Sequence, residues 1–175
     1  MLDLELLGLE SVLNLGAGTY EGTMSHGGIW NYFNCYKRKV AIDANQVKLD
    51  TWKNSSWETK CFTAFCTVPF PFEKDSFDVV VGTDFLEHLS EDTAEWVILE
   101  AEYIAKKYVI WFTPIGFMDT EIYQPGLVNC EYDKHLSGFT PEYFTNWGYK
   151  TQIYDVFHIY GDKTWGAMWA WKDVS

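Results

Sequence analysis

The sequence predicts an α/β fold in which a doubly wound, mostly parallel sheet ends in an antiparallel hairpin. Short apolar segments that suit buried strands recur along the first two thirds of the chain, with helical patterns between them. Near the C-terminus the hydrophobic period changes to two on both sides of a Gly-Asp-Lys turn. Because no linker-like stretch interrupts the 175 residues, we expect residues 1–175 to form a single domain.

Five segments have the character of parallel strands. They are Ser11–Leu15, Lys39–Asp43, Lys60–Phe65, Phe77–Gly82 and Tyr108–Phe112. The third is the weakest, because polar and apolar residues are mixed in it. In open α/β sheets, ligands bind beyond the carboxyl ends of the strands, where the winding reverses. We therefore expect the functional residues directly after these segments.

The strongest helix signal runs from Glu91 to about Lys106. Ser90 can cap its N-terminus, and apolar residues recur at helical spacing along one face. Lys106 and Lys107 are expected to close the helix at the negative end of its dipole.

A second helix is expected to begin after the capping residue Thr140, with Pro141 in its first position, and to end at Gly148. The period-two segments Thr151–Tyr160 and Thr164–Trp171 follow it and predict the hairpin.

Charge and composition argue against several classes of function. Thirteen basic and twenty-five acidic residues give a net charge of −12, which disfavours nucleic acid as a partner. No apolar window reaches the roughly 18 residues of a membrane span, and the N-terminus lacks the basic region of a signal peptide. The four cysteines have no zinc-site spacing, so we expect a cytoplasmic protein with reduced, mostly buried cysteines and no metal site. The sequence contains no signal for an oligomeric state.

A glycine-rich turn, Gly16-Ala17-Gly18, follows the first strand. Its two glycines allow a tight turn and close approach of a ligand, although a plain strand-to-helix turn is an equal alternative. Because position 21 is Glu, the full GxGxxG pattern is missing, which disfavours a pyrophosphate site and a nicotinamide oxidoreductase.

An acidic residue, Asp43, ends the second strand. A carboxylate at this place can accept hydrogen bonds from the two ribose hydroxyls of a nucleoside. The alternative is that Asp43 caps the helix that follows.

The most specific motif covers Val68–Leu89 and reads VPFPFEKDSFDVVVGTDFLEHL. This block resembles the corresponding block of class I S-adenosylmethionine-dependent methyltransferases, in the small type 11-like group. The loop Asn14–Thr19, the strand end at Asp43 and the final hairpin occur in the order of that family, so the resemblance covers most of the chain. It implies a Rossmann-like, seven-stranded methyltransferase fold and S-adenosylmethionine as cofactor.

The resemblance also implies a set of cofactor-binding residues. The glycine-rich turn would pass under the methionine part, Asp43 would hold the ribose, and the residues after the fourth strand would lie beside the transferable methyl group. The implied residues are Asn14, Gly16, Ala17, Gly18, Thr19, Asp43, Ala44, Ala64, Phe65, Thr83, Asp84 and Phe85.

Three residues depart from the family pattern. Asn14 replaces an acidic residue, Tyr20 replaces the third glycine of the loop, and Ala64 replaces an acidic residue near the adenine. The leading interpretation is a methyltransferase that acts on a small-molecule or sugar-like acceptor. The alternative is a catalytically inactive binding or scaffold protein with the same fold.

A hydroxyl acceptor would require a base, and two histidines are candidates. His88 follows the fourth strand, and His135 lies in the long connection Thr113–Phe139. For His88 a packing role is an equally good interpretation. Because connections of this length in compact domains are commonly functional, we expect this one to form the acceptor-side wall or lid.

Overall fold

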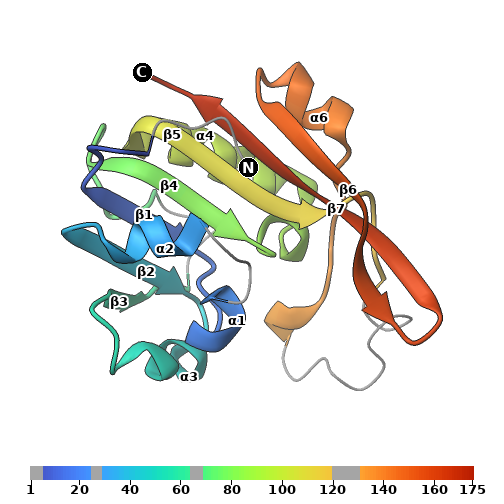
Figure 1. Cartoon of the computed structure of the whole chain (residues 1–175), viewed down its shortest axis with the longest axis horizontal. Helices are drawn as coiled ribbons and strands as arrows, with labels where there is room; N and C mark the ends of the chain where they lie inside the picture. The colour runs from blue at the N-terminus through green and yellow to red at the C-terminus, as the bar shows by residue number, and fades with distance from the viewer. Residues whose placement is uncertain (1–5, 25–28, 64–68, 120–130) are drawn as a thin grey trace.

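The fold is a seven-stranded sheet with helices on both faces (Figure 1). The computed structural model describes residues 6–24, 29–63, 69–119 and 131–175. Its strands are β1 (Ser11–Leu15), β2 (Arg38–Asp43), β3 (Glu58–Cys61), β4 (Phe77–Thr83), β5 (Ala105–Pro114), β6 (Lys150–Tyr160) and β7 (Lys163–Asp173).

The strand order is β3-β2-β1-β4-β5-β7-β6. The first five strands run parallel, whereas β7 pairs antiparallel with both β5 and β6. This arrangement confirms the predicted doubly wound sheet and its C-terminal hairpin. The winding reverses between β1 and β4, and the adjacent carboxyl ends of these strands are therefore the expected place for a ligand.

The described helices are α1 (Tyr20–Met24), α2 (Ile29–Asn34), α3 (Gln46–Leu49), α4 (Glu91–Ile104) and α6 (Pro141–Asn146), with 3₁₀ turns η1 (Asp50–Trp52), η2 (Leu86–His88) and η3 (Glu131–Asp133). Of the described α-helices, α4 is the long one, and the others have four to six residues. The predicted caps are confirmed, since the side chains of Ser90 and Thr140 accept hydrogen bonds from the amides of Thr93 and Tyr143. In the described part of the chain, none of the helices has the length and apolarity of a membrane span.

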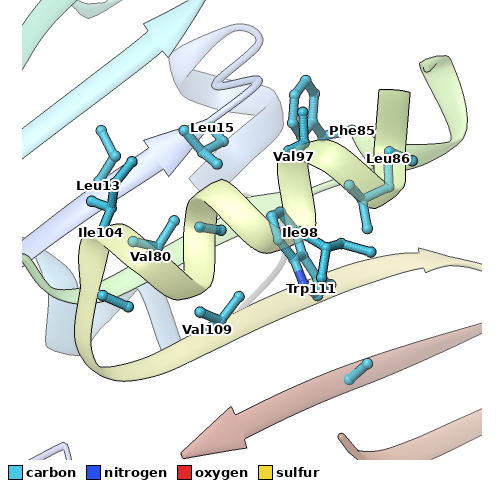
Figure 2. Close-up of a cluster of buried hydrophobic side chains, with 14 of the residues drawn as sticks. Leu13, Leu15, Val80, Phe85, Leu86, Val97, Ile98, Ile104, Val109 and Trp111 are labelled. Carbon is cyan, nitrogen blue, oxygen red and sulfur yellow. The ribbon is translucent and has the colours of Figure 1, made fainter. Parts of the chain in front are cut away.

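One hydrophobic core lies between α4 and the sheet (Figure 2). The buried face of α4 comprises Ala94, Val97, Ile98, Ala101 and Ile104, as the helical spacing predicts. These side chains pack against residues of the three central strands, among them Leu13, Val80 and Val109. Because alternate strand residues point to opposite faces, their neighbours along the strands enter a second core.

The second core is rich in tryptophan. It forms on the opposite face, where Trp30 and Phe33 of α2 meet Trp52 of η1 and Trp57. The rings of Trp52 and Trp57 lie 5.3 Å apart in an edge-to-face contact. Both faces of the central strands are thus covered, which explains why these strands read as continuous apolar runs.

Two boundaries differ from the sequence-based expectation. Helix α4 ends at Ile104, and Lys106 and Lys107 belong to β5 rather than to the helix. The reason is that the amides of Asp75 and Ser76, just before β4, donate to the carbonyls of Tyr103 and Ile104, so the helix end is satisfied without the lysines.

Strand β3 covers Glu58–Cys61 instead of Lys60–Phe65. It is the edge strand of the sheet, where exposed charged residues are common and blur the apolar pattern. Ala64 and Phe65 lie outside the described residues.

The expectation of mostly buried cysteines is wrong for two of the four. Cys35 and Cys61 are free and exposed, because Cys35 follows the end of α2 and Cys61 ends the edge strand. Cys66 and Cys130 lie outside the described residues.

A polar contact at the amino ends of β1 and β4 fastens these two central strands together. One carboxylate oxygen of Asp78 accepts hydrogen bonds from the amides of Glu10 and Ser11, at 2.9 Å each, and from the Ser11 hydroxyl at 2.8 Å. Burial acts to raise the pKa of Asp78, but these hydrogen bonds outweigh it and hold the pKa below its usual value.

We expect Asp78→Asn to destabilise the protein by about 1–2 kcal/mol at pH 7, because charge-assisted hydrogen bonds are lost. Since the pKa is lower in the folded than in the unfolded state, the carboxylate stabilises the fold above the unfolded pKa of about 4, and this contribution disappears as the pH falls through the folded pKa. Urea unfolding of both proteins at several pH values measures this. A difference in unfolding free energy that stays constant from neutral pH to about pH 3 contradicts the prediction.

Candidate functional site

A cleft of about 240 Å³ opens at the carboxyl ends of β1, β2 and β4. It lies where the winding of the sheet reverses. Its walls are the glycine-rich turn, the residues after β2, the residues after β4, and parts of α3 and η3. The lining residues are Gly16, Ala17, Gly18, Thr19, Gly22, Thr23, Asp43, Ala44, Lys48, Thr83, Asp84, Phe85, His88, Leu89 and Tyr132.

The glycine-rich turn is left-handed at both of its glycines, with φ of +63° at Gly16 and +57° at Gly18. The amide of Ala17 donates to the carbonyl of Ile42 at 2.9 Å, so the turn stays attached to β2. A Cβ at Gly18 would have no atom within 4 Å, which means that the backbone there is accessible to a ligand. The turn can therefore present its main chain to a molecule in the cleft.

Phe85 requires a glycine at position 16. A Cβ added at Gly16 would lie 2.1 Å from Cδ2 and 2.8 Å from Cβ of Phe85. The turn after β1 and the turn after β4 are thus packed against each other, and the phenyl ring forms part of the wall between them.

We expect Gly16→Ala to destabilise the protein by about 2–4 kcal/mol, because it combines left-handed strain with a clash against Phe85. Gly161→Ala in the hairpin turn is the matched control, since its φ is +65° and a Cβ there meets nothing within 4 Å. It should cost only the strain, about 1–2 kcal/mol. Thermal unfolding compares the two variants, and equal losses would show that Phe85 moves aside freely.

Asp43 connects the turn after β1 with the start of α3. Its Oδ2 accepts from the amide of Gly18 at 2.8 Å, and its Oδ1 accepts from the amide of Asn45 at 2.7 Å. The capping residue of α3 is Asn45, whose side chain accepts from the amides of Val47 and Lys48. Asp43 is therefore not the helix cap. Because each carboxylate oxygen has two lone pairs, one acceptor position on each oxygen remains for a ligand.

Side chains of α1 and η1 hydrogen-bond to the carbonyl groups of the glycine-rich turn. The indole Nε1 of Trp52 donates to the carbonyl of Gly18 at 3.0 Å, and the hydroxyl of Thr23 donates to the carbonyl of Ala17. Tyr20, which occupies the place of a third glycine, begins α1 and packs edge-on against Trp52 at 5.1 Å. These contacts hold the turn in its conformation, and Tyr20 contributes by packing against Trp52.

Two further polar residues line the cleft after β4. Thr83 ends the strand, and Asp84 has a left-handed φ of +46°. The amide of Asp84 donates to the carbonyl of Phe112 in β5 at 2.9 Å, which anchors this unusual backbone to the sheet. The chain then enters η2, which carries Glu87 and His88.

The long connection after β5 returns to η2 and brings the two candidate histidines together. The amides of Leu136 and Ser137 donate to the carbonyl of Glu87 at 2.7 and 3.1 Å. As a result the ring of His135 meets the ring of His88 edge-on, with centroids 4.7 Å apart. His88 lines the cleft, and His135 lies directly behind it.

Both imidazoles are neutral near pH 7. Burial lowers the pKa of His88, and burial together with the neighbouring His88 lowers the pKa of His135 to about 4. A ring with this pKa is a weak proton acceptor at neutral pH. The lowered pKa thus disfavours His135 as a general base.

The structure brings nine of the twelve implied cofactor-binding residues to this single cleft. Asn14 lies in β1, fully buried and away from the cleft lining. Ala64 and Phe65 lie outside the described residues, as does the central part of the Thr113–Phe139 connection.

Five lining residues were not expected: Gly22, Thr23, Lys48, Leu89 and Tyr132. Lys48 reaches the cleft from α3, where its ammonium forms a 2.6 Å ion pair with Asp133 of η3. This ion pair joins positions 48 and 133, and nothing in the local pattern around either residue indicates it.

No family model matches the sequence, and no curated protein matches it. Solved structures do resemble it. A protein from Bacillus halodurans, described as a putative methyltransferase, has a TM-score of 0.63 to this chain. The two are 14% identical, and the match covers 97% of this chain and 94% of the other. A SAM-dependent methyltransferase from Archaeoglobus fulgidus has a TM-score of 0.62 at 13% identity, covering 94% and 87% of the two chains.

A third similar structure is the YcgJ protein from Bacillus subtilis, with a TM-score of 0.62 at 13% identity over 94% and 92% of the two chains. At these identities the likeness concerns the fold. The fold of this chain is the seven-stranded, Rossmann-like fold of S-adenosylmethionine-dependent methyltransferases, as the sequence predicts.

Proposed function

We propose that this protein is an S-adenosylmethionine-dependent methyltransferase that acts on a small-molecule or sugar-like acceptor. The observation that carries the proposal is the contact between the glycine-rich turn and Asp43 in one cleft at the reversal of the sheet. The resemblance of the Val68–Leu89 block supports the small type 11-like group within this class.

The chemistry of the cleft fits this cofactor. The accessible backbone at Gly18 suits the methionine part, and the remaining lone pairs of Asp43 suit the two ribose hydroxyls. Thr83, Asp84 and Phe85 line the same cleft after β4, where the transferable methyl group would face an acceptor. When bound, S-adenosylmethionine supplies a methyl group already activated on a sulfonium.

The residues of this chain therefore have to position and desolvate rather than to activate the donor. The buried Phe85 excludes water from the wall between the two turns. Asp84 is held by its backbone contact to β5 and places a carboxylate at the acceptor side. The net charge of −12 supports a small acceptor rather than a nucleic acid.

One observation favours the inactive alternative. Both polar side-chain atoms of Asn14 are buried without a hydrogen-bond partner among the described residues, in the position where the resemblance expects an acidic residue. A site that has lost its original charge can leave such a residue behind. The binding experiment separates the two functions.

Calorimetric titration with S-adenosylmethionine and with its demethylated product tests the proposal. We expect saturable binding of both, and no binding of NAD⁺, because the turn lacks the full pyrophosphate pattern. Absence of heat and of thermal stabilisation at about millimolar cofactor, well above typical cofactor affinities, would refute it. Binding of both ligands without methyl transfer to any of a panel of hydroxyl and amine acceptors would favour the inactive alternative.

A further inference from the structure

Three potential metal ligands meet where the long connection after β5 packs against η2. Glu87 and His88 come from η2, and His135 comes from the returning segment. One carboxylate oxygen of Glu87 and one ring nitrogen of each histidine all lie within 4.8 Å of one another. The cluster adjoins the cleft, since His88 is part of the cleft wall.

A backbone carbonyl fixes the tautomer of each ring. Nδ1 of His88 lies 3.1 Å from the carbonyl oxygen of Lys134, and Nδ1 of His135 lies 2.7 Å from that of Met118. A carbonyl only accepts, so each Nδ1 carries the proton and each neutral ring has its lone pair on Nε2. A backbone carbonyl that fixes the tautomer in this way is a typical outer partner of a metal-ligating histidine.

The carboxyl group of Glu87 is only partly compensated within the described residues. The residue is 1% exposed, and the Thr113 hydroxyl donates to its Oε2 at 3.1 Å. Its Oε1 is buried and has no hydrogen-bond partner in the described part of the chain. A bound cation would give this buried oxygen a partner.

We propose that Glu87, His88 and His135 bind a divalent transition-metal cation at the acceptor side of the cleft. Two imidazoles and one carboxylate suit Mn²⁺, Fe²⁺, Co²⁺ or Zn²⁺, and three protein ligands leave coordination positions open. Asp84 is close enough to act electrostatically on all three side chains and adds negative charge around the cation.

The acceptor class follows if the proposed methyltransferase function holds. A cation with open positions next to the transferable methyl group selects an acceptor that carries a hydroxyl, whose pKa it lowers. The hydroxyl proton leaves to solvent water, the oxygen lone pair forms the new bond to the methyl carbon, and the C–S bond breaks with its electrons on sulfur. The products are a methyl ether and the neutral thioether. In this scheme the bound cation would take the place of a histidine base.

Metal binding can be measured without cofactor or acceptor. The full chain is treated with EDTA, which is then removed, and Mn²⁺ is titrated by calorimetry and by thermal unfolding. A second titration uses Zn²⁺ on a Cys35→Ser/Cys61→Ser background, because these two exposed thiols bind Zn²⁺ on their own. We expect one saturable site and a higher melting temperature with the metal.

Single substitutions identify the ligands. Glu87→Gln, His88→Gln and His135→Gln should each weaken metal binding by about 100-fold or more, whereas Glu91→Gln, on the exposed start of α4, should leave it unchanged. Glu87→Gln should also keep or raise the melting temperature of the metal-free protein, because a neutral amide replaces a buried acid. This readout separates loss of a ligand from loss of the fold.

Two results would overturn the proposal: no saturable binding of either metal, or equal binding by the wild type and all three ligand variants. The outcome does not depend on the cofactor. Failure of S-adenosylmethionine to bind while the metal does bind would count against the proposed function alone, and the reverse result would count against the metal site alone.

Discussion

Asp43→Ala should weaken binding of S-adenosylmethionine by about 100-fold or more. The substitution removes the proposed acceptors for two ribose hydroxyls, and hydrogen bonds to a charged group contribute about 1.5–3 kcal/mol each. It also releases the amide of Gly18, so the glycine-rich turn loses its attachment at the point where the methionine part would lie.

Calorimetric titration of the purified variant measures this loss, and circular dichroism establishes that it folds. Asp92→Ala provides the control, because Asp92 is an exposed carboxylate in the first turn of α4 and takes no part in the cleft. If Asp43→Ala folds and binds the cofactor as tightly as the control, then Asp43 only supports the turn, and the proposed ribose contact is wrong.

The parts of the fold that follow from local patterns are predictable from the sequence. A strand buried on both faces appears as an apolar run, which is why β1 is predicted at its observed bounds, β4 up to one residue before its end, and β5 in its central part. Helix starts are also local signals, because a capping side chain accepts a hydrogen bond from an amide three positions further on, as at Ser90 and Thr140. Residues that directly follow such strands, including Gly16 and Asp43, can therefore be placed near one another from topology alone.

Contacts between distant segments are not predictable in this way. His135 meets His88 only because the chain returns after β5 and hydrogen-bonds to the backbone of Glu87. Positions 87, 88 and 135 do not have a spacing that is typical of metal ligands, which is why the sequence predicts no metal site. The end of α4 is misplaced for the same reason, since its last carbonyls are satisfied by the turn before β4 and not by neighbouring lysines.

The largest loss of stability should come from Trp111→Ala in β5. The indole is fully buried in the core beneath α4 and packs over Gly82 of β4, where an added Cβ would lie 2.7 Å from Cζ3 of the ring. Truncation opens a cavity between two central strands, and we expect a loss of about 3–5 kcal/mol in the free energy of unfolding. Urea denaturation measures it against Leu99→Ala on the exposed face of α4, which should change stability by less than about 0.5 kcal/mol.

The nearby Tyr149→Phe variant provides a smaller loss of stability with which that of Trp111→Ala can be compared. It removes the weak hydrogen bond from the Trp111 indole to the Tyr149 hydroxyl, at 3.4 Å, together with the contact of that hydroxyl with Glu102, and should cost about 1–2 kcal/mol. The molecules of Trp111→Ala that remain folded should bind S-adenosylmethionine with the affinity of the wild type, because the side chain belongs to the core and not to the cleft lining. A loss as small as that of Tyr149→Phe would mean that the two central strands close over the vacated volume, and that Gly82 is not required by the ring.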